Sequence, residues 1–537
     1  MKNVTAILSL LHEPAGVRCS AIRQFRQKPV LAWTLGRLVQ CRELAGIAVL
    51  CWDDQKPAVA EATGTTAVIR SRSRTVVPEL ESVAAAQRWA DGWRGGLLAT
   101  CNFDLGFYGP WHHELASELR SDAIVLIEPA AALVDPELID RLVSHAKSDD
   151  TLEYAFAPAA PGLMGFLIRP TLLNRLAAAK AHPGRLMHYH PDQTSREPIA
   201  APNCLNIPAP LARTLHRFTL DSDRQISRIN AATESLNGQL IHSGAEELVR
   251  RSQSTPHFGM LPREIVLELN TNRATRPIYW AGLAVGTQRE NLTLEKTKSL
   301  FSELASAEGT RVTLAGIGDP LLHPHAFEII KAAHEEGRAT INVETDLLDL
   351  SDQQLEQLAA CEADVISVNV PALSPRTYAA VMGRDALAMA LDNVRRLLAL
   401  RNQRGSVPIV TAIFTKCRQN LAEMEPWYDQ WIRALGAAVV RGPSDFVGKI
   451  PDVSVGDMAP SGRRPCARLA ARVTILSDGT IVACEQDVCG SKPLGHIGRD
   501  RLADVWKGGM QSLRDDHLAG NLTNQPLCAG CREWHRP

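Results

Sequence analysis

The stretch Ser477-Asp478-Gly479-Thr480-Ile481-Val482-Ala483-Cys484 lies between Cys466 and the closing Cys528-Ala529-Gly530-Cys531. Written as spacing, this is C-x12-G-x4-C followed by C-x2-C. A C-x2-C turn lets two thiolates reach one metal centre, and an Asp-Gly hairpin over 473–483 can present Cys484 beside them. Four thiols in this arrangement therefore indicate a metal or iron–sulfur site within residues 466–537.

The same segment resembles the SPASM domain, the C-terminal cluster-binding module of many radical SAM enzymes. The resemblance rests on the cysteine spacing, the hairpin, the Leu494-Gly495-His496-Ile497 step and Trp506. It implies one [4Fe–4S] cluster held by Cys466, Cys484, Cys528 and Cys531. A four-thiolate zinc site fits the same ligands, and reduced, unligated thiols are the third alternative. Cys489 lies where the family varies, so we expect a bystander or a spare ligand.

The overall composition limits the class of protein. With 537 residues, 45% of them hydrophobic and 22% charged, the chain is globular and too long for one core. A formal net charge of −1 argues against a nucleic-acid partner. No apolar run reaches the roughly 20 residues that span a bilayer, so we expect no membrane insertion. Twelve irregularly spaced cysteines without an export signal favour the cytoplasm.

Residues 1–250 predict an α/β domain with a Rossmann-type sheet, in which strands and helices alternate. Apolar runs indicate buried strands at 4–11, 46–51 and 123–127, with helices at 29–41 and 136–146. This βαβ order is typical of a sheet with parallel strands.

Part of this region resembles cytidylyltransferase-like sugar nucleotidyltransferases. The resemblance lies in Gln27-Lys28-Pro29-Val30-Leu31, 133–140 and 217–223. It implies a nucleotide and Mg²⁺ site, but Ser20 stands where a loop lysine is expected and Ala130 where a magnesium-binding aspartate is expected. Asp221 matches the second aspartate, and one carboxylate holds magnesium poorly without its partner. We therefore predict a nucleotidyltransferase-like fold that has lost catalysis, with an active transferase as the alternative.

Residues 251–263, rich in serine, proline and histidine, indicate a linker. After it, strands and helices alternate as far as residue 446, with strands at 264–269, 311–316, 340–344, 365–370, 409–414 and 438–441. Six βα units at this spacing predict a partial (β/α)6 barrel, whose site would lie at the C-terminal ends of the strands. Residues 447–465, rich in glycine and proline, indicate a second linker before the domain at 466–537.

The turn after the second of these strands reads Gly316-Ile317-Gly318-Asp319-Pro320. It resembles the G-x-G-E-P segment of radical SAM enzymes. The resemblance implies that Gly316, Gly318, Asp319 and Pro320 hold the amino group of S-adenosylmethionine (SAM). The alternative is that the glycines serve only a tight turn between strand and helix.

The loop after the first strand departs from that family. Asn272, Arg276 and Tyr279 align with its three cluster cysteines, and no cysteine occurs between Cys204 and Cys361. Arginine carries only hydrogen-bond donors and cannot ligate iron. We therefore predict that this region holds no cluster and cannot cleave SAM reductively.

The combination of regions resembles the spiro-SPASM family. Both larger regions depart from the patterns of the families they resemble at the catalytic positions. We therefore predict a cytoplasmic iron–sulfur pseudoenzyme that acts in binding, as a scaffold or in electron transfer. Its ligand would be a peptide, a protein or a nucleotide sugar, and SAM or a nucleotide is a further candidate. The alternatives are an active nucleotidyl- or glycosyl-type transferase and a radical SAM enzyme that modifies peptides or sugars. The sequence assigns no catalytic residue.

Overall fold

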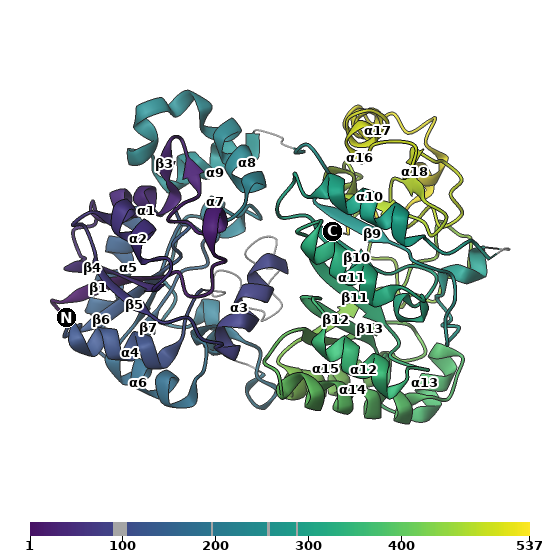
Figure 1. The fold of residues 1–537 in the computed structure, drawn as a ribbon, viewed down its shortest axis with the longest axis horizontal. Coiled ribbons are helices and arrows are strands. Elements are labelled where there is room, and N and C mark those ends of the chain that lie inside the picture. The colour runs from purple at the N-terminus through teal and green to yellow at the C-terminus, as the bar shows by residue number, and fades with distance from the viewer. Residues whose placement is uncertain (90–104, 195–196, 255–257, 286–287, 537) are drawn as a thin grey trace. The chain divides into compact units, whose positions relative to one another are not determined.

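The computed structural model describes residues 1–89, 105–194, 197–254, 258–285 and 288–536. They divide into two compact units, Met1–His257 and Phe258–Pro537 (Figure 1). Helix α9 (Ala245–Ser254) extends into the start of the first predicted linker, whose residues 255–257 lie outside the described ranges. Within those ranges, no helix combines the length and the apolar composition needed to cross a membrane.

The N-terminal unit is built on a six-stranded sheet with the order β5-β4-β1-β6-β8-β7. The strands are β1 (Val4–Ser9), β4 (Gly46–Trp52), β5 (Val68–Arg72), β6 (Ala123–Ile127), β7 (Tyr154–Ala155) and β8 (Phe166–Ile168). The four strands from β5 to β6 are parallel, whereas β8 and β7 each run antiparallel to their neighbours. The strands predicted at 4–11, 46–51 and 123–127 are confirmed as β1, β4 and β6.

Helices cover both faces of this sheet because its central strands are apolar on both sides. In β1, Ala6 and Leu8 pack into one core, while Ile7 packs into the other. The helices are α1 (Val30–Leu38), α2 (Lys56–Thr63), α3 (Pro78–Trp89), α4 (Gly109–Glu118), α5 (Pro136–Ser148), α6 (Pro170–Ala179), α7 (Ala209–Arg213), α8 (Asp223–Thr233) and α9. A short hairpin of β2 (Gln24–Phe25) and β3 (Lys28–Pro29) precedes α1.

The C-terminal unit contains a nine-stranded sheet with the order β14-β13-β12-β11-β10-β9-β15-β16-β17. Its strands are β9 (Glu264–Leu267), β10 (Arg311–Leu314), β11 (Thr340–Thr345), β12 (Val365–Asn369), β13 (Ile409–Thr415), β14 (Ala438–Arg441), β15 (Arg472–Ile475), β16 (Thr480–Val482) and β17 (Gly495–His496). Neighbours from β14 to β9 are parallel, so the predicted strands and their parallel pairing are confirmed.

The predicted hairpin in the tail is confirmed as the antiparallel pair β15 and β16. Sequence reasoning did not predict that β15 also pairs with β9, in parallel, with Arg472 opposite Glu264 and Ile475 opposite Leu267. The cysteine-bearing tail therefore continues the sheet formed by the preceding strands.

The two faces of this sheet have different chemistry. Alternate strand residues such as Ile265 and Val312 pack with helix residues such as Phe301 in one apolar core. The helices are α10 (Leu294–Leu304), α11 (Ala326–Glu335), α12 (Asp352–Ala360), α13 (Pro375–Met382), α14 (Leu387–Asn402), α15 (Met424–Leu435), α16 (Leu502–Lys507), α17 (Gly509–Leu518) and α18 (Pro526–Gly530). The intervening strand residues face the other way, as strand geometry requires.

Candidate functional site

A cavity of about 660 Å³ lies against the face of the C-terminal sheet opposite this core. In β15, Arg472 and Thr474 line the cavity, while Val473 and Ile475 alternate with them in the core. Further strands contribute Val266, Thr313, Glu344, Thr415 and Arg441. A volume of this size is typical of sites for small molecules.

The lining of this cavity is highly charged. It carries five arginines and four glutamates: Arg273, Arg441, Arg468, Arg472, Arg536, Glu268, Glu344, Glu485 and Glu533. Many of them pair: Arg441 Nη1 lies 2.9 Å from Glu344 Oε2, and Arg472 Nη1 lies 3.2 Å from Glu485 Oε1. Because charges of both signs line it, the cavity suits a polar ligand that presents both signs.

A buried ion pair occupies the loop after β9, where the sequence predicts a lost cluster. Arg273 Nε donates to Asp346 Oδ2 at 2.9 Å, and the Asp346 side chain has no exposed surface. Asp346 also accepts hydrogen bonds from Thr275 Oγ1 and Asn369 Nδ2. The loop is therefore fixed to the end of β11 by a guanidinium–carboxylate pair.

The three residues aligned with the family's cluster cysteines have other contacts. Asn272 Oδ1 accepts from Gln288 Nε2, and Tyr279 Oη lies 3.6 Å from Met382 Sδ. Arg276 is exposed, and its backbone N–H donates to Met382 O at 2.9 Å. An amide, a guanidinium and a phenol are not the thiolate donors that iron–sulfur clusters use, so these residues do not fit a cluster.

The turn at Gly316–Pro320 is closed by its own neighbours. Ile317 N donates to Glu268 Oε2 at 2.9 Å, and Gly318 N donates to Asn270 O at 3.2 Å. A Cβ at Gly316 would lie 2.6 Å from Glu268 Cγ, and one at Gly318 would lie 2.3 Å from Asn270 O. Both glycines are thus needed for close packing, which gives the tight-turn alternative a physical basis.

Asp319 and Pro320 of the same turn are buried. Asp319 Oδ2 accepts from Thr345 Oγ1 and from Asp346 N, both at 2.8 Å. Burial raises the pKa of Asp319, and the neighbouring Asp346 carboxylate raises it further. The carboxylate therefore belongs to the internal network that also holds Arg273.

The four tail cysteines have partly buried side chains, whereas Cys489 is exposed. Burial raises the pKa of Cys528 to about 11, and the nearby thiols of Cys466 and Cys531 raise it further. Burial likewise raises the pKa of Cys484, with Cys466 among its neighbours. Within the described ranges, no group of three or more histidine, cysteine, aspartate or glutamate side chains is arranged to hold a metal ion. The thiol chemistry fits a cluster or zinc, and binding would require the sulfur atoms to draw closer.

Arg468 links the three segments that carry these cysteines. It is 8% exposed, and its Nη1 lies 2.9 Å from Glu485 Oε1 while its Nη2 lies 3.5 Å from Glu533 Oε2. Glu485 follows Cys484 directly, and Glu533 lies two residues after Cys531. Sequence reasoning missed this arginine because its partners are distant in the chain.

In the N-terminal unit, the two positions that align with the magnesium-binding aspartates of nucleotidyltransferases, Ala130 and Asp221, lie close together. Leu220 N donates to Ala130 O at 2.8 Å, which places Asp221 beside the alanine. The Asp221 carboxylate, however, accepts from Arg217 Nη2 and from Thr219 Oγ1. An ion pair therefore engages Asp221, the carboxylate that the sequence predicts there for magnesium.

In the loop after β1, the side chain of Glu13 accepts hydrogen bonds from Ser20 of the same loop. Glu13 Oε2 accepts from Ser20 N at 2.7 Å and from Ser20 Oγ at 2.9 Å. His12 Nε2 lies 3.3 Å from Glu128 Oε1. Burial raises the pKa of Glu13 to about 7; Glu128 raises it further, while His12 opposes the shift. A glutamate thus engages the loop amide at Ser20, where a nucleotide-binding loop would bind phosphate.

Glu13→Gln is expected to change how stability depends on pH. Because the folded-state pKa of Glu13 lies above the ordinary 4.5, the protonated form favours folding, and that contribution is lost as pH rises from 4.5 to about 7. The wild type should lose up to about 3 kcal/mol relative to the glutamine variant across this window. Urea unfolding at pH 5 and pH 7.5 measures the difference. The exposed Glu137→Gln is the control, and parallel pH profiles for wild type and Glu13→Gln would contradict the expectation.

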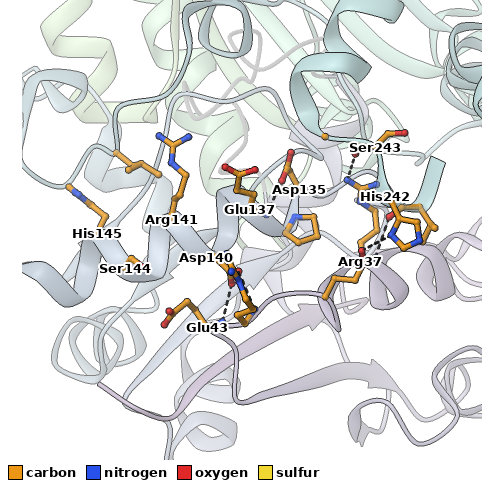
Figure 2. A pocket seen from close by; sticks show the side chains of 16 residues that line it. Arg37, Glu43, Asp135, Glu137, Asp140, Arg141, Ser144, His145, His242 and Ser243 are labelled. Atoms are coloured by element: carbon orange, nitrogen blue, oxygen red, sulfur yellow. Dashed lines mark hydrogen bonds and ion pairs between the residues drawn. The ribbon is translucent and has the colours of Figure 1, made fainter. Parts of the chain in front are cut away.

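A second cavity, of about 930 Å³, lies in the N-terminal unit beside the segment 133–140 (Figure 2). Asp135 Oδ1 accepts from Glu137 N at 2.9 Å and its Oδ2 from Ala245 N at 2.6 Å, so one carboxylate caps both α5 and α9. Arg37, 1% exposed, donates to the carbonyl oxygens of Val134, Leu240 and Ser243. The side chains of Asp135 and Arg37 therefore hold neighbouring backbone segments in place through these hydrogen bonds.

Two family models match parts of this chain. The Radical SAM superfamily matches residues 278–428, and the SPASM iron–sulfur cluster-binding domain matches residues 466–532. The predictions of a radical SAM-like region and a SPASM region are therefore confirmed. The first match begins after Asn272 and Arg276, and the second includes all four cysteines predicted as ligands.

The chain is also similar to individual proteins. It is 22% identical to an uncharacterized protein of Treponema pallidum over 51% of this chain and 79% of the relative. It is 27% identical to a GTP 3′,8-cyclase of Chlorobaculum tepidum over 27% and 44% of the two chains. Among solved structures, Streptococcus suis SuiB bound to precursor peptide SuiA has a TM-score of 0.41 and 13% identity over 51% and 72%. A cytidylyltransferase from Leptospira borgpetersenii has a TM-score of 0.33 and 14% identity over 48% and 95%.

Proposed function

We propose that this chain is a cytoplasmic iron–sulfur protein that binds a small polar ligand and carries out no radical chemistry. Its second unit would be a degenerate radical SAM partial barrel, and its tail cysteines would hold one [4Fe–4S] cluster. The N-terminal unit would be a nucleotidyltransferase-like domain of the Rossmann type without catalysis. The observation that carries this proposal is the buried pair of Arg273 and Asp346 in the loop after β9.

This pair supports the loss of radical chemistry for an energetic reason. A buried guanidinium and carboxylate stabilise each other, and removing either partner leaves an uncompensated charge. A cluster in this loop would need thiolates where the chain provides Asn272, Arg276 and Tyr279. Glu268 and Asn270 also pack against the glycines of the turn that would hold SAM. Ligand binding in the charged cavity is the activity that remains.

The tail thiols support the cluster part of the proposal. A [4Fe–4S] cluster there would supply either a structural crosslink or a one-electron carrier. Burial raises the pKa of the Cys528 thiol, and the positive charge of Arg463, which donates to the carbonyl oxygen atoms of Cys528 and Cys531, partly opposes that rise. Cations beside these thiols favour the thiolates that a metal requires.

The test is the metal content and SAM chemistry of anaerobically purified full-length protein. We expect about four irons and four sulfides per chain, and no 5′-deoxyadenosine from SAM and dithionite above the protein-free control. About eight irons together with 5′-deoxyadenosine would overturn the loss of radical chemistry. One zinc and no sulfide would overturn the iron–sulfur assignment.

A further inference from the structure

Two of the cysteines predicted as cluster ligands receive a hydrogen bond on sulfur from the backbone. Glu533 N donates to Cys531 Sγ at 3.3 Å, from two residues further along the chain. Gln486 stands in the same relation to Cys484: burial raises the pKa of that thiol, and a hydrogen bond from the Gln486 backbone opposes the rise. Hydrogen bonds to the sulfur atoms are among the factors that set the reduction potential of a cluster.

The side chains of the two donor residues are joined to each other. Gln486 Nε2 donates to Glu533 Oε2 at 3.2 Å. Both residues are buried, Gln486 with 2% and Glu533 with 8% of its surface exposed. This contact links the segment after Cys484 to the segment after Cys531, and it therefore ties the position of one sulfur-bound N–H group to that of the other.

Arg468 holds the same two segments from the side. Its Nη1 lies 2.9 Å from Glu485 Oε1, and its Nη2 lies 3.5 Å from Glu533 Oε2. The side chain is 8% exposed, so its charge is poorly screened by water and acts strongly on its neighbours. Burial raises the pKa of Cys484 and of Cys531, and the positive charge of Arg468 opposes the rise in both thiols. The guanidinium therefore fixes the donor residues and also acts on the sulfur atoms through its charge.

We propose that Arg468 is a positioning residue that raises the reduction potential of the tail cluster. It acts through Gln486 and Glu533, whose backbone N–H groups contact the sulfur atoms of two ligands. Reduction adds negative charge to a cluster, and both N–H donors and a buried cation stabilise the more negative state. The inference rests on the proposed iron–sulfur function of the tail and concerns how this chain regulates that site.

The test is a dye-mediated redox titration of the anaerobic full-length protein, followed by electron paramagnetic resonance, for wild type and Arg468→Gln. We expect a more negative midpoint potential in the variant, because it loses a buried cation and leaves the carboxylates of Glu485 and Glu533 less compensated. At the wild-type midpoint, the ratio of reduced to oxidised cluster should fall about tenfold, which is about 59 mV for a one-electron couple.

Arg514→Gln is the matched control. Arg514 is also a buried arginine of the tail, 5% exposed, and its guanidinium donates to the carbonyl oxygen atoms of Leu469 and Trp506. Removing it should disturb local packing to a similar extent, because it too leaves buried acceptors without their donor. The midpoint potential of this variant should match that of the wild type.

Gln486→Leu separates positioning from charge. It removes the side-chain contact with Glu533 without changing the net charge, so a smaller shift in the same direction is expected. Arg468→Lys keeps the charge but loses the planar fork that reaches two carboxylates, and its potential should lie between those of wild type and Arg468→Gln. If Arg468→Gln does not retain a cluster, Gln486→Leu decides the outcome.

An unchanged potential in Gln486→Leu, or an equal shift in Arg468→Gln and Arg514→Gln, would overturn the proposal. Iron, sulfide and zinc content, measured on the same preparations, report separately on the proposed function. An intact cluster with unchanged potentials contradicts the role of Arg468 alone, whereas zinc without sulfide in the wild type contradicts the iron–sulfur assignment and this proposal with it.

Discussion

Arg273→Ala is expected to lower the free energy of unfolding by about 3–5 kcal/mol, the cost of leaving a buried charge without its partner. Asp346 loses its cation while its side chain stays fully enclosed. Asp319, also buried, accepts a hydrogen bond from Asp346 N and so lies beside the same centre. Two carboxylates then share a buried site that holds no guanidinium, and each disfavours ionisation of the other.

Urea unfolding of wild type and variant, followed by tryptophan fluorescence, measures this loss. Arg384→Ala is the matched control, because Arg384 pairs with Asp349 where both side chains are substantially exposed. Exposed pairs contribute about 0–1 kcal/mol, so the control should change little. A loss of 1 kcal/mol or less in Arg273→Ala would contradict the role assigned to the pair. Unchanged iron content in this variant would agree with a loop that holds no cluster.

Cys528→Ala/Cys531→Ala is expected to remove essentially all bound iron and sulfide. Two of four thiolates are lost, and two remaining ligands do not retain a [4Fe–4S] cluster. Iron and sulfide analysis with a visible spectrum, on anaerobic protein, measures the loss. The variant should remain folded, because most of the sheet of the C-terminal unit is formed by strands β9 to β14.

Cys489→Ala and Cys361→Ala are the controls for this pair of substitutions. Cys489 is exposed, with its Sγ 3.3 Å from Lys449 Nζ, and Cys361 Sγ donates to Leu358 O. Both variants should retain the wild-type iron content. Loss of iron in Cys489→Ala would make that residue a ligand and would require the predicted set of four to be revised.

The sequence predicts β1, β4 and β6 of the N-terminal sheet and β9 to β14 of the C-terminal sheet, because buried parallel strands are short apolar runs, readable without knowledge of their partners. The run at 123–127 and the strand β6 coincide for this reason. The radical SAM-like and SPASM regions are also predictable, since glycine and cysteine spacing is local. The pairing of β15 with β9 joins Arg472 to Glu264, far apart in the chain, and no periodicity reports such a contact.

The lining of the charged 660 Å³ cavity could not be predicted from the sequence for the same reason. Arg468, Glu485 and Thr474 are ordinary residues until folding brings them together. One local signal exists, because Arg472-Val473-Thr474-Ile475 alternates polar and apolar side chains as a strand with one polar face does. The ion pairs at Asp221 and Asp346 carry no such signal. Sequence could show which ligands are missing there, but not which side chains had taken their place.

The parallel contact between β15 and β9 has a consequence for any shortened form of this protein. A chain ending before residue 466 would lose β15, and β9 would become an edge strand with open backbone N–H and C=O groups. Val266 and Ile265 would then lie on an unprotected rim, which is a template for intermolecular strand pairing and precipitation. By pairing with β9, the cysteine-bearing tail therefore also protects the sheet from intermolecular strand pairing, independently of any metal that it binds.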